Sequence, residues 1–139
     1  MNEALRSDLK RGLNSINIVL DNPTQLGIDA DQSKEGEVGK DGLSISGVRK
    51  MQVLFKDIDL TNQPINISGG FSSLPITLLF TAYANETRTS LMNIKGSITS
   101  DPYEYLIANG DLPISLKQIF DEMKLATELM IKSNSPIKT

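Results

Sequence analysis

A regular alternation of residue types follows Gly42, and it constrains the fold more than any other feature of the sequence. Apolar residues or glycine occupy positions of a single parity in this stretch: Leu43, Ile45, Gly47, Met51, Val53 and Phe55. Because successive side chains of a β-strand point to opposite faces, this spacing predicts a long, half-buried strand over residues 43–55. Ile58 and Leu60 continue on the opposite parity, which predicts a bulge near Lys56 and Asp57.

Further strands are predicted between residues 63 and 99. Pro64 cannot donate to a ladder of hydrogen bonds, so residues 63–70 are predicted to form an edge strand or a connection. The segment Ile76–Ala84 is almost entirely apolar or β-favouring, and it is predicted to be the central strand. Residues 88–99 fit either a strand or one face of a helix, and we interpret them as a strand.

Three helices are predicted around these strands. Leucine and isoleucine recur at spacings of three and four residues, which predicts an amphipathic helix over Asn2–Leu20. Asp101 and Ser115 are each followed three residues later by glutamate or glutamine, a pattern typical of a helix start. These two starts predict helices over residues 102–109 and 116–132.

The predicted fold class is α+β, because the runs of strands are separated from the runs of helices. An antiparallel sheet of about four strands is expected to be packed by an N-terminal helix and two C-terminal helices. The chain of 139 residues can bury one core, so residues 1–132 are predicted to form a single α+β domain. A long acidic loop is predicted over residues 21–42, and a flexible C-terminal tail over residues 133–139.

The amino-acid composition excludes several kinds of chemistry. The chain contains no cysteine and no histidine, so it lacks thiolate ligands, disulfides and the commonest general base. We therefore predict no catalytic, cofactor-binding or metal-binding residue and no enzymatic activity, although Asp, Glu, Lys, Tyr or Ser chemistry is left as a third hypothesis. No basic stripe and no apolar run of membrane-spanning length is present, so neither a nucleic acid nor a membrane is predicted as a partner.

The acidic stretch from Asp29 to Gly42 is the strongest candidate for a binding surface. Its spacing from Asp31 matches the start of a calcium loop, but Gly42 stands where the closing glutamate is required. We interpret the stretch as a solvated loop whose carboxylates contact a partner protein. The predicted contact residues are Asp29, Asp31, Glu35, Glu37 and Asp41.

Other partial motifs fail for definite reasons. The Gly-Lys pair at residues 39–40 is followed by Asp41, where a phosphate-binding loop needs serine or threonine. Ser7 and Lys10 share one helical turn, but the companion motifs of penicillin-binding enzymes are missing. Asp57 and Asp59 would share one strand face, where an isolated pair is more often solvated than bound to Mg²⁺.

The succession of an amphipathic N-terminal segment, an irregular loop, residues 40–60 and the proline-led aromatic segment Pro75–Tyr83 resembles a known family. Over Asn2–Ala84 it is similar to the tail-terminator, or tail-completion, proteins of phages and contractile injection systems. The resemblance implies a non-enzymatic assembly subunit that forms a homo-oligomer, possibly a ring, and contacts other structural proteins of the same particle. It also implies a location in the host cytoplasm during assembly and then in the virion.

A second hypothesis comes from a different class of function. A chain with no catalytic constellation could instead be a small soluble inhibitor or ligand-binding protein that sequesters a host protein or a small molecule. A rise in melting temperature with a ligand panel would favour this alternative.

Overall fold

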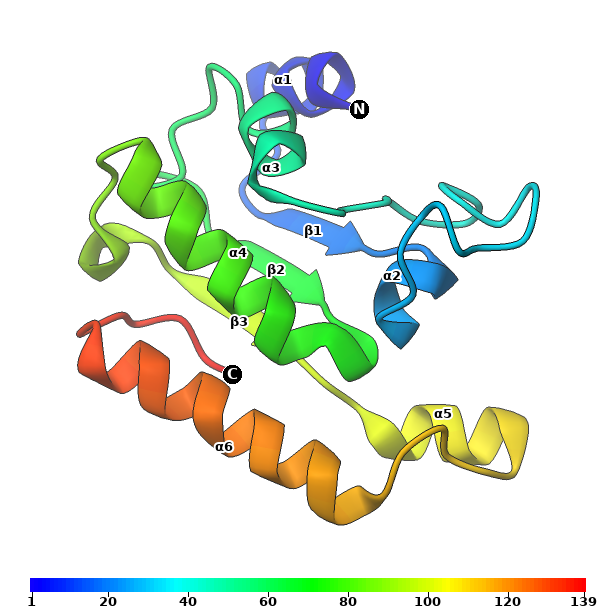
Figure 1. The fold of residues 1–139 in the computed structure, drawn as a ribbon. Helices are drawn as coiled ribbons and strands as arrows, with labels where there is room; N and C mark the ends of the chain where they lie inside the picture. Colours follow the sequence, from blue (N-terminus) through cyan, green and yellow to red (C-terminus); the bar gives the residue numbers. More distant parts are fainter.

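The structure is a computed structural model that describes residues 1–139. Its centre is a three-stranded sheet formed by β1 (Ile16–Val19), β2 (Ile65–Ser68) and β3 (Gly96–Thr99). All three strands are parallel, and they lie in the order β1-β2-β3 (Figure 1). Parallel strands that alternate with helices make a Rossmann-like α/β fold.

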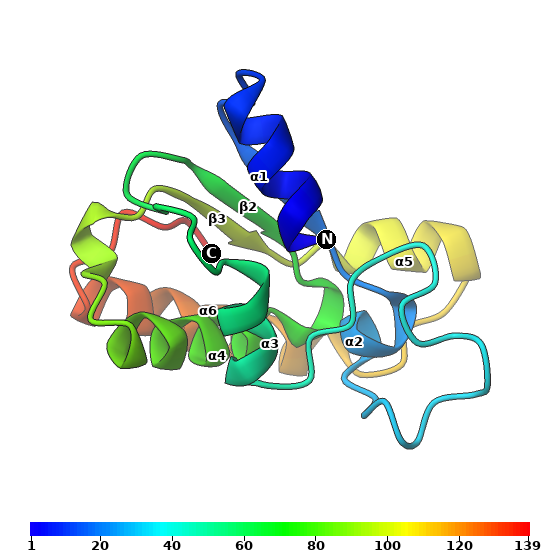
Figure 2. The same ribbon diagram turned by 90° about the horizontal axis from the view of Figure 1, so that it is seen from above.

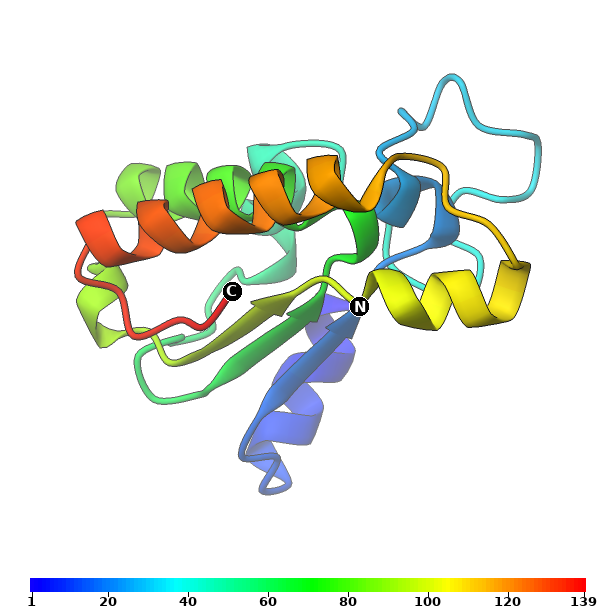
Figure 3. The same ribbon diagram turned by 90° about the horizontal axis from the view of Figure 1, so that it is seen from below.

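Helices supply every connection in this sheet. Six α-helices surround the strands: α1 (Asn2–Lys10), α2 (Asn22–Leu26), α3 (Val48–Leu54), α4 (Ser73–Glu86), α5 (Pro102–Asn109) and α6 (Leu116–Lys132). Two short 3₁₀ turns, η1 (Gly70–Ser72) and η2 (Leu91–Asn93), precede α4 and β3. Helices α4 and α6 cover one face of the sheet, and α2 and α5 lie at the end where the strands point (Figures 1 and 3). Helix α1 stands away from α4 and α6, on the β1 side (Figure 2).

The two faces of the sheet have opposite character. The face toward α4 and α6 carries buried isoleucines: Ile16, Ile18, Ile65, Ile67 and Ile98. They pack in one core with Phe80, Ile76 and Met51, all of which are at most 1% exposed. The alternate positions of the same strands are Asn, Ser, Thr and one Val, and they are exposed or half-buried. One sheet face is therefore the hydrophobic core, and the other is a polar surface.

The antiparallel α+β prediction is wrong. β1 pairs with β2, and β2 with β3, in parallel register, with Ile16 opposite Ile65 and Ile65 opposite Gly96. Parallel neighbours need a crossover connection, and helices α3 and α4 supply the two crossovers. β2 is also the central strand and not an edge strand. Pro64 precedes its first residue, so the missing N–H does not interrupt the ladder.

The predicted central strand over Ile76–Ala84 is wrong, because this segment lies within α4. Its buried residues, among them Ile76, Phe80, Tyr83 and Ala84, follow helical spacing. Thr77 and Thr81 donate their hydroxyls to carbonyl oxygens one turn earlier, which satisfies those β-favouring side chains inside a helix. Burial on several sides masks the helical period in the sequence.

The predicted strand over residues 43–55 is also wrong, and the predicted helix over Asn2–Leu20 is confirmed only as far as Lys10. Residues 48–54 form α3, whose inward side chains Met51 and Leu54 are three residues apart. Helix α1 ends at Lys10, and Gly12 then takes a φ of 105°, which breaks the helix. Ile16 and Leu20 therefore belong to the strand region that follows.

The predictions for the last two helices are confirmed. α5 and α6 span residues 102–109 and 116–132. Asp101 accepts hydrogen bonds from the backbone N–H groups of Tyr103 and Glu104, and Ser115 accepts one from Gln118. A strand occupies only residues 96–99 of the segment 88–99. None of the six helices has both the length and the apolar character needed to cross a bilayer.

Short bridges flank the outer strands of the sheet. Leu43 pairs with Leu20 beyond the end of β1, and Lys138 pairs with Ser97 beside β3. The Lys138 carbonyl accepts the Ile98 N–H at 2.8 Å, and the Lys138 N–H donates to the Gly96 carbonyl at 3.0 Å.

The division into a domain over residues 1–132, a loop over 21–42 and a flexible tail over 133–139 stays a prediction.

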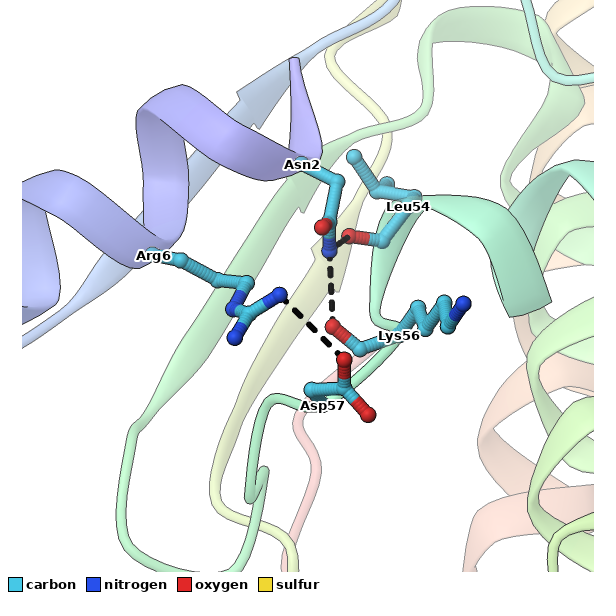
Figure 4. A network of polar contacts seen from close by, with 5 residues as sticks. All are labelled: Asn2, Arg6, Leu54, Lys56 and Asp57. Carbon is cyan, nitrogen blue, oxygen red and sulfur yellow. Dashed lines mark hydrogen bonds and ion pairs between the residues drawn. The ribbon is translucent and has the colours of Figure 1, made fainter.

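Two side chains attach α1 to the end of α3 (Figure 4). The Asn2 amide donates to the carbonyl oxygens of Leu54 and Lys56 at 2.7 and 2.8 Å. Arg6 forms an ion pair with Asp57 at 3.2 Å, but both side chains are about half exposed. The hydrogen bonds from the Asn2 side chain satisfy carbonyl oxygens that the end of a helix leaves free. They therefore contribute more to stability than the exposed ion pair does.

Replacing Asn2 by alanine is expected to lower the free energy of unfolding by about 1 kcal/mol. Arg6→Ala is expected to cost less than about 1 kcal/mol, because water screens an exposed ion pair. Urea denaturation of both variants, with Glu3→Ala on the exposed side of α1 as the control, measures the difference. An Asn2 variant as stable as the control would show that α1 is held by its leucines alone.

Candidate functional site

A cavity of about 210 Å³ lies where β2 and β3 end. Parallel α/β proteins bind ligands beyond the carboxyl ends of their strands, because the loops there converge on one place. Residues from β2, β3, η1, α2 and α5 line the cavity: Asn22, Gln25, Leu26, Ser68, Gly70, Phe71, Thr99, Asp101, Glu104, Tyr105, Ala108 and Asn109. This cavity is the best candidate for a ligand site.

Two glycines after β2 allow the chain to turn tightly beneath the cavity. Gly69 donates its N–H to the Thr99 carbonyl at 2.8 Å, and a Cβ there would lie 2.9 Å from the Ser73 Cα. Gly70 has a φ of 56°, and a Cβ there would lie 2.8 Å from the Gln25 Cβ. Any larger residue would push η1 away from α2, so the glycine pair fixes the cavity floor.

Helix α5 forms one wall of the cavity. The Asp101 carboxylate caps its first turn, and the left-handed Gly110 ends it. Tyr105 projects from this helix against Phe71 of η1, with ring centroids 4.9 Å apart and rings nearly perpendicular. The wall therefore combines an aromatic edge with the carboxylates of Asp101 and Glu104.

The polar face of the sheet leads from the strands toward this cavity. Asn66 of β2 donates its side-chain amide to the side-chain oxygen of Asn17 at 3.0 Å, and the Ser97 hydroxyl of β3 donates to the side-chain oxygen of Asn66 at 3.0 Å. These three residues are in register across the sheet. Ser68 and Thr99 come two residues later on the same face, and both line the cavity. The polar face and the cavity are thus one continuous set of hydrogen-bonding groups.

Asp21 holds the long loop against the end of β1. Its side chain is 1% exposed and accepts hydrogen bonds from the N–H of Thr24 at 3.0 Å and of Gly39 at 2.6 Å. Burial raises the pKa of Asp21, but the hydrogen bonds from Thr24, Gly39 and Ser44 outweigh it, so its pKa lies below the ordinary 3.8. Asp21 is therefore a charged anchor for residues around Gly39.

The predicted contact residues lie on the surface of the loop between α2 and α3. Asp29, Asp31, Glu35 and Asp41 are exposed, and Glu37 is half-buried. Nothing in the structure tests whether they contact a partner, so this stays a prediction. The structure brings no three acidic side chains together in a group that could hold a metal ion.

The remaining candidates from the sequence lie outside the cavity. Asp57 pairs with Arg6. Asp59 accepts hydrogen bonds from the Thr61 hydroxyl and N–H and from the Asn62 amide, and these bonds lower its pKa below the ordinary value. Asp59 thus stabilises its own turn at the amino-terminal side of β2. Ser7 and Lys10 lie on α1, away from the strand ends.

The sequence pattern does not reveal the cavity residues, because it predicts the wrong elements around them. Ser68, Gly69 and Gly70 form a signal in the sequence, since a short strand ends in a polar residue and two glycines follow it directly. Asp101 follows β3 in the same way, but its sequence neighbours predict only a helix cap. In a parallel sheet, the segments that follow β2 and β3 lie at the same end of the sheet.

A family model described as methylmalonyl-CoA mutase matches residues 1–139, the whole chain. The chain belongs to the methylmalonyl-CoA mutase family. The "Methylmalonyl-CoA mutase large subunit" of Porphyromonas gingivalis is 30% identical, over 96% of this chain and 19% of that protein. "Methylmalonyl-CoA mutase" of Escherichia coli is 30% identical over 78% of this chain and 15% of that protein. "Ethylmalonyl-CoA mutase" of Cereibacter sphaeroides is 27% identical over 78% and 17%. The chain thus spans less than a fifth of each of these relatives.

This family membership corrects several predictions. The resemblance to phage tail-terminator proteins is wrong, because the family model covers the same residues and more. The predictions of a structural virion subunit, of particle proteins as partners and of a location in a virion are wrong for the same reason. The prediction that the chain is not an enzyme is contradicted as well, since its relatives are named as mutases.

Proposed function

We propose that this chain is part of an acyl-CoA mutase and that it contributes binding surface for the acyl-CoA substrate. The observation that carries the proposal is the family match over the whole chain. The names of the relatives give the substrate class, a CoA thioester of a branched dicarboxylic acid. A mutase moves a group within one molecule, so it must hold its substrate in one orientation during the reaction.

The polar sheet face and the cavity support this role. Acyl-CoA carries amide, hydroxyl and thioester groups along an extended arm, and such groups need hydrogen-bond partners when they leave water. Asn17, Asn66, Ser97, Ser68 and Thr99 offer partners along one surface of the sheet. The cavity itself contains carboxylates, amides, hydroxyls and two aromatic rings. We assign these groups to binding and orientation and none to proton transfer.

The chain supplies only part of what such an enzyme needs. It corresponds to between 15% and 20% of the length of its relatives, and its sheet has three strands with one polar face uncovered. The proposal therefore concerns the intact protein, to which this segment contributes one section of the substrate surface.

Replacing Thr99 by valine in the intact protein is expected to weaken methylmalonyl-CoA binding about two- to tenfold. Valine keeps the shape of the side chain but removes a hydroxyl that can bond to the substrate. Calorimetric titration measures the affinity, and Thr127→Val on the exposed side of α6 is the matched control. The proposal fails if neither methylmalonyl-CoA nor ethylmalonyl-CoA binds the intact protein, or if both variants bind exactly as the unaltered protein does.

A further inference from the structure

A second cavity, of about 170 Å³, lies between α2 and the first half of α4. Two stretches of the loop between α2 and α3 complete its walls. Five apolar side chains, four hydroxyls and one carboxylate line it, together with a glycine and a proline. It shares no lining residue with the cavity at the ends of β2 and β3. The second cavity is therefore a separate place on the molecule, and the proposed function does not use it.

The floor of the second cavity is apolar. Ile45 and Ile76 are buried, and Leu79 of α4 is half-buried. Ile28 and Pro75 are exposed, so they lie at its mouth. An apolar protein cavity of about 150 Å³ holds one benzene molecule. The second cavity is thus large enough for an apolar group of that size.

Ser72 adds one unused polar group to this apolar floor. It is 3% exposed, and its Oγ lies 3.4 Å from the place that a Cβ on Gly27 would occupy. Although Ser72 is the N-cap residue of α4, its side chain accepts no hydrogen bond from that helix, and it bonds to no other group of the protein. A buried hydroxyl without a partner is unfavourable, so a ligand oxygen that bonds to Ser72 is stabilised.

The other polar side chains of the second cavity are engaged or lie in water. The hydroxyls of Thr24 and Ser44 both bond to the carboxylate of Asp21. Ser46 and Asp29 are exposed, and Asp29 is the only charged residue of the lining. Its carboxylate repels an anion, whereas a cation would lose its water of hydration among isoleucines. The lining therefore selects an uncharged ligand.

We propose that the second cavity binds a small uncharged alcohol of about the size of phenol. The ligand hydroxyl bonds to Ser72, and its apolar body packs against Ile45, Ile76 and Leu79. A free phenol and the side chain of a tyrosine on a polypeptide both offer this chemistry. The inference goes beyond the proposed function and does not depend on it, because the two cavities have no residue in common.

The test uses phenol, benzene and benzoate as separate probes of the intact protein. Shifts of the Ile45 and Ile76 methyl signals in NMR spectra locate each probe, and their titration gives its affinity. Phenol is expected to bind about two- to tenfold more tightly than benzene, because only phenol can bond to Ser72. Benzoate is expected to bind at least about tenfold more weakly than phenol, because its charge is repelled and loses water.

Replacing Ser72 by alanine tests the hydrogen bond. This variant is expected to bind phenol and benzene equally, with the affinity for benzene unchanged. Ser90→Ala, which alters an exposed serine beyond the end of α4, is the matched control and is expected to keep the preference for phenol. N-acetyltyrosine amide distinguishes the two sources of the ligand. If it binds as tightly as phenol, the cavity takes a tyrosine side chain, and if only phenol binds, it takes a free small molecule.

Three results would overturn the inference. The first is that phenol leaves the Ile45 and Ile76 signals of the unaltered protein in place. The second is that benzene or benzoate binds as tightly as phenol does. The third is that Ser72→Ala keeps the full preference for phenol. The affinity for methylmalonyl-CoA is measured separately, so each of these results leaves the proposed function standing.

Discussion

Replacing Gly96 by alanine is expected to lower the free energy of unfolding by about 3–5 kcal/mol, a large part of what a domain of this size possesses. Gly96 is the first residue of β3 and has a φ of 137°, a conformation that residues with a Cβ rarely adopt. A Cβ at this position would also clash with the backbone carbonyl of Ile65 on the central strand. Relief of the clash requires the two strands to separate.

Urea denaturation monitored by circular dichroism measures the loss of stability in Gly96→Ala. Gly47→Ala is the matched control, because Gly47 has extended backbone and no atom lies within 4 Å of its added Cβ. The control is expected to change stability by less than about 0.5–1 kcal/mol. Equal stability of the two variants would contradict the pairing of β2 with β3 at this register.

Replacing Asp21 by alanine is expected to lower the free energy of unfolding by about 2–4 kcal/mol. The substitution removes the cap of α2 and the buried acceptor of the Gly39 N–H, and it leaves both donors without their partner. Asp21→Asn is expected to lose less, about 1–2 kcal/mol, because one acceptor oxygen remains. The amide of Gly39 is expected to exchange with solvent faster in both variants.

The contribution of Asp21 depends on pH in a defined direction. Its pKa in the folded protein lies below the ordinary 3.8, so its stabilisation is complete above that value. The stabilisation decreases as the pH falls below 3.8 and through the folded pKa. The stability difference between the unaltered protein and Asp21→Ala is thus expected to shrink in acid. Asp29→Ala, which removes an exposed carboxylate of the same loop, serves as the control. A loss of stability in Asp29→Ala as large as the loss in Asp21→Ala would show that the charge of the loop, and not the buried Asp21 side chain, determines the effect.

The helix caps could be predicted from the sequence because they depend on neighbours in the chain. Asp101 and Ser115 bond to backbone groups two or three residues away, so their role is visible without knowledge of the fold. The predicted bounds of α5 and α6 follow directly from these caps. Short parallel strands are different, because each is only four residues long and its partners lie 28 or more residues away.

Alternation in a sequence did not distinguish a strand from a helix in two decisive places. Met51 of α3 and Phe55, which directly follows this helix, satisfy both a period of two and a helical spacing of four. In α4, the β-favouring residues Ile76, Thr77 and Phe80 are buried in a helix, because packing against the sheet outweighs local preference. A strand prediction for these two segments hides both the parallel sheet and the cavity at the strand ends.

The short bridges beside the outer strands bear on self-association. A sheet with free edges exposes unpaired N–H and C=O groups, on which other chains can add strands and begin to aggregate. Here Lys138 occupies two of the hydrogen-bonding groups of β3, and Leu43 continues the pairing just beyond β1. With strands of only four residues, little free edge remains for an incoming chain. Loss of the Lys138 pairing would lengthen that free edge and increase the tendency of the protein to precipitate.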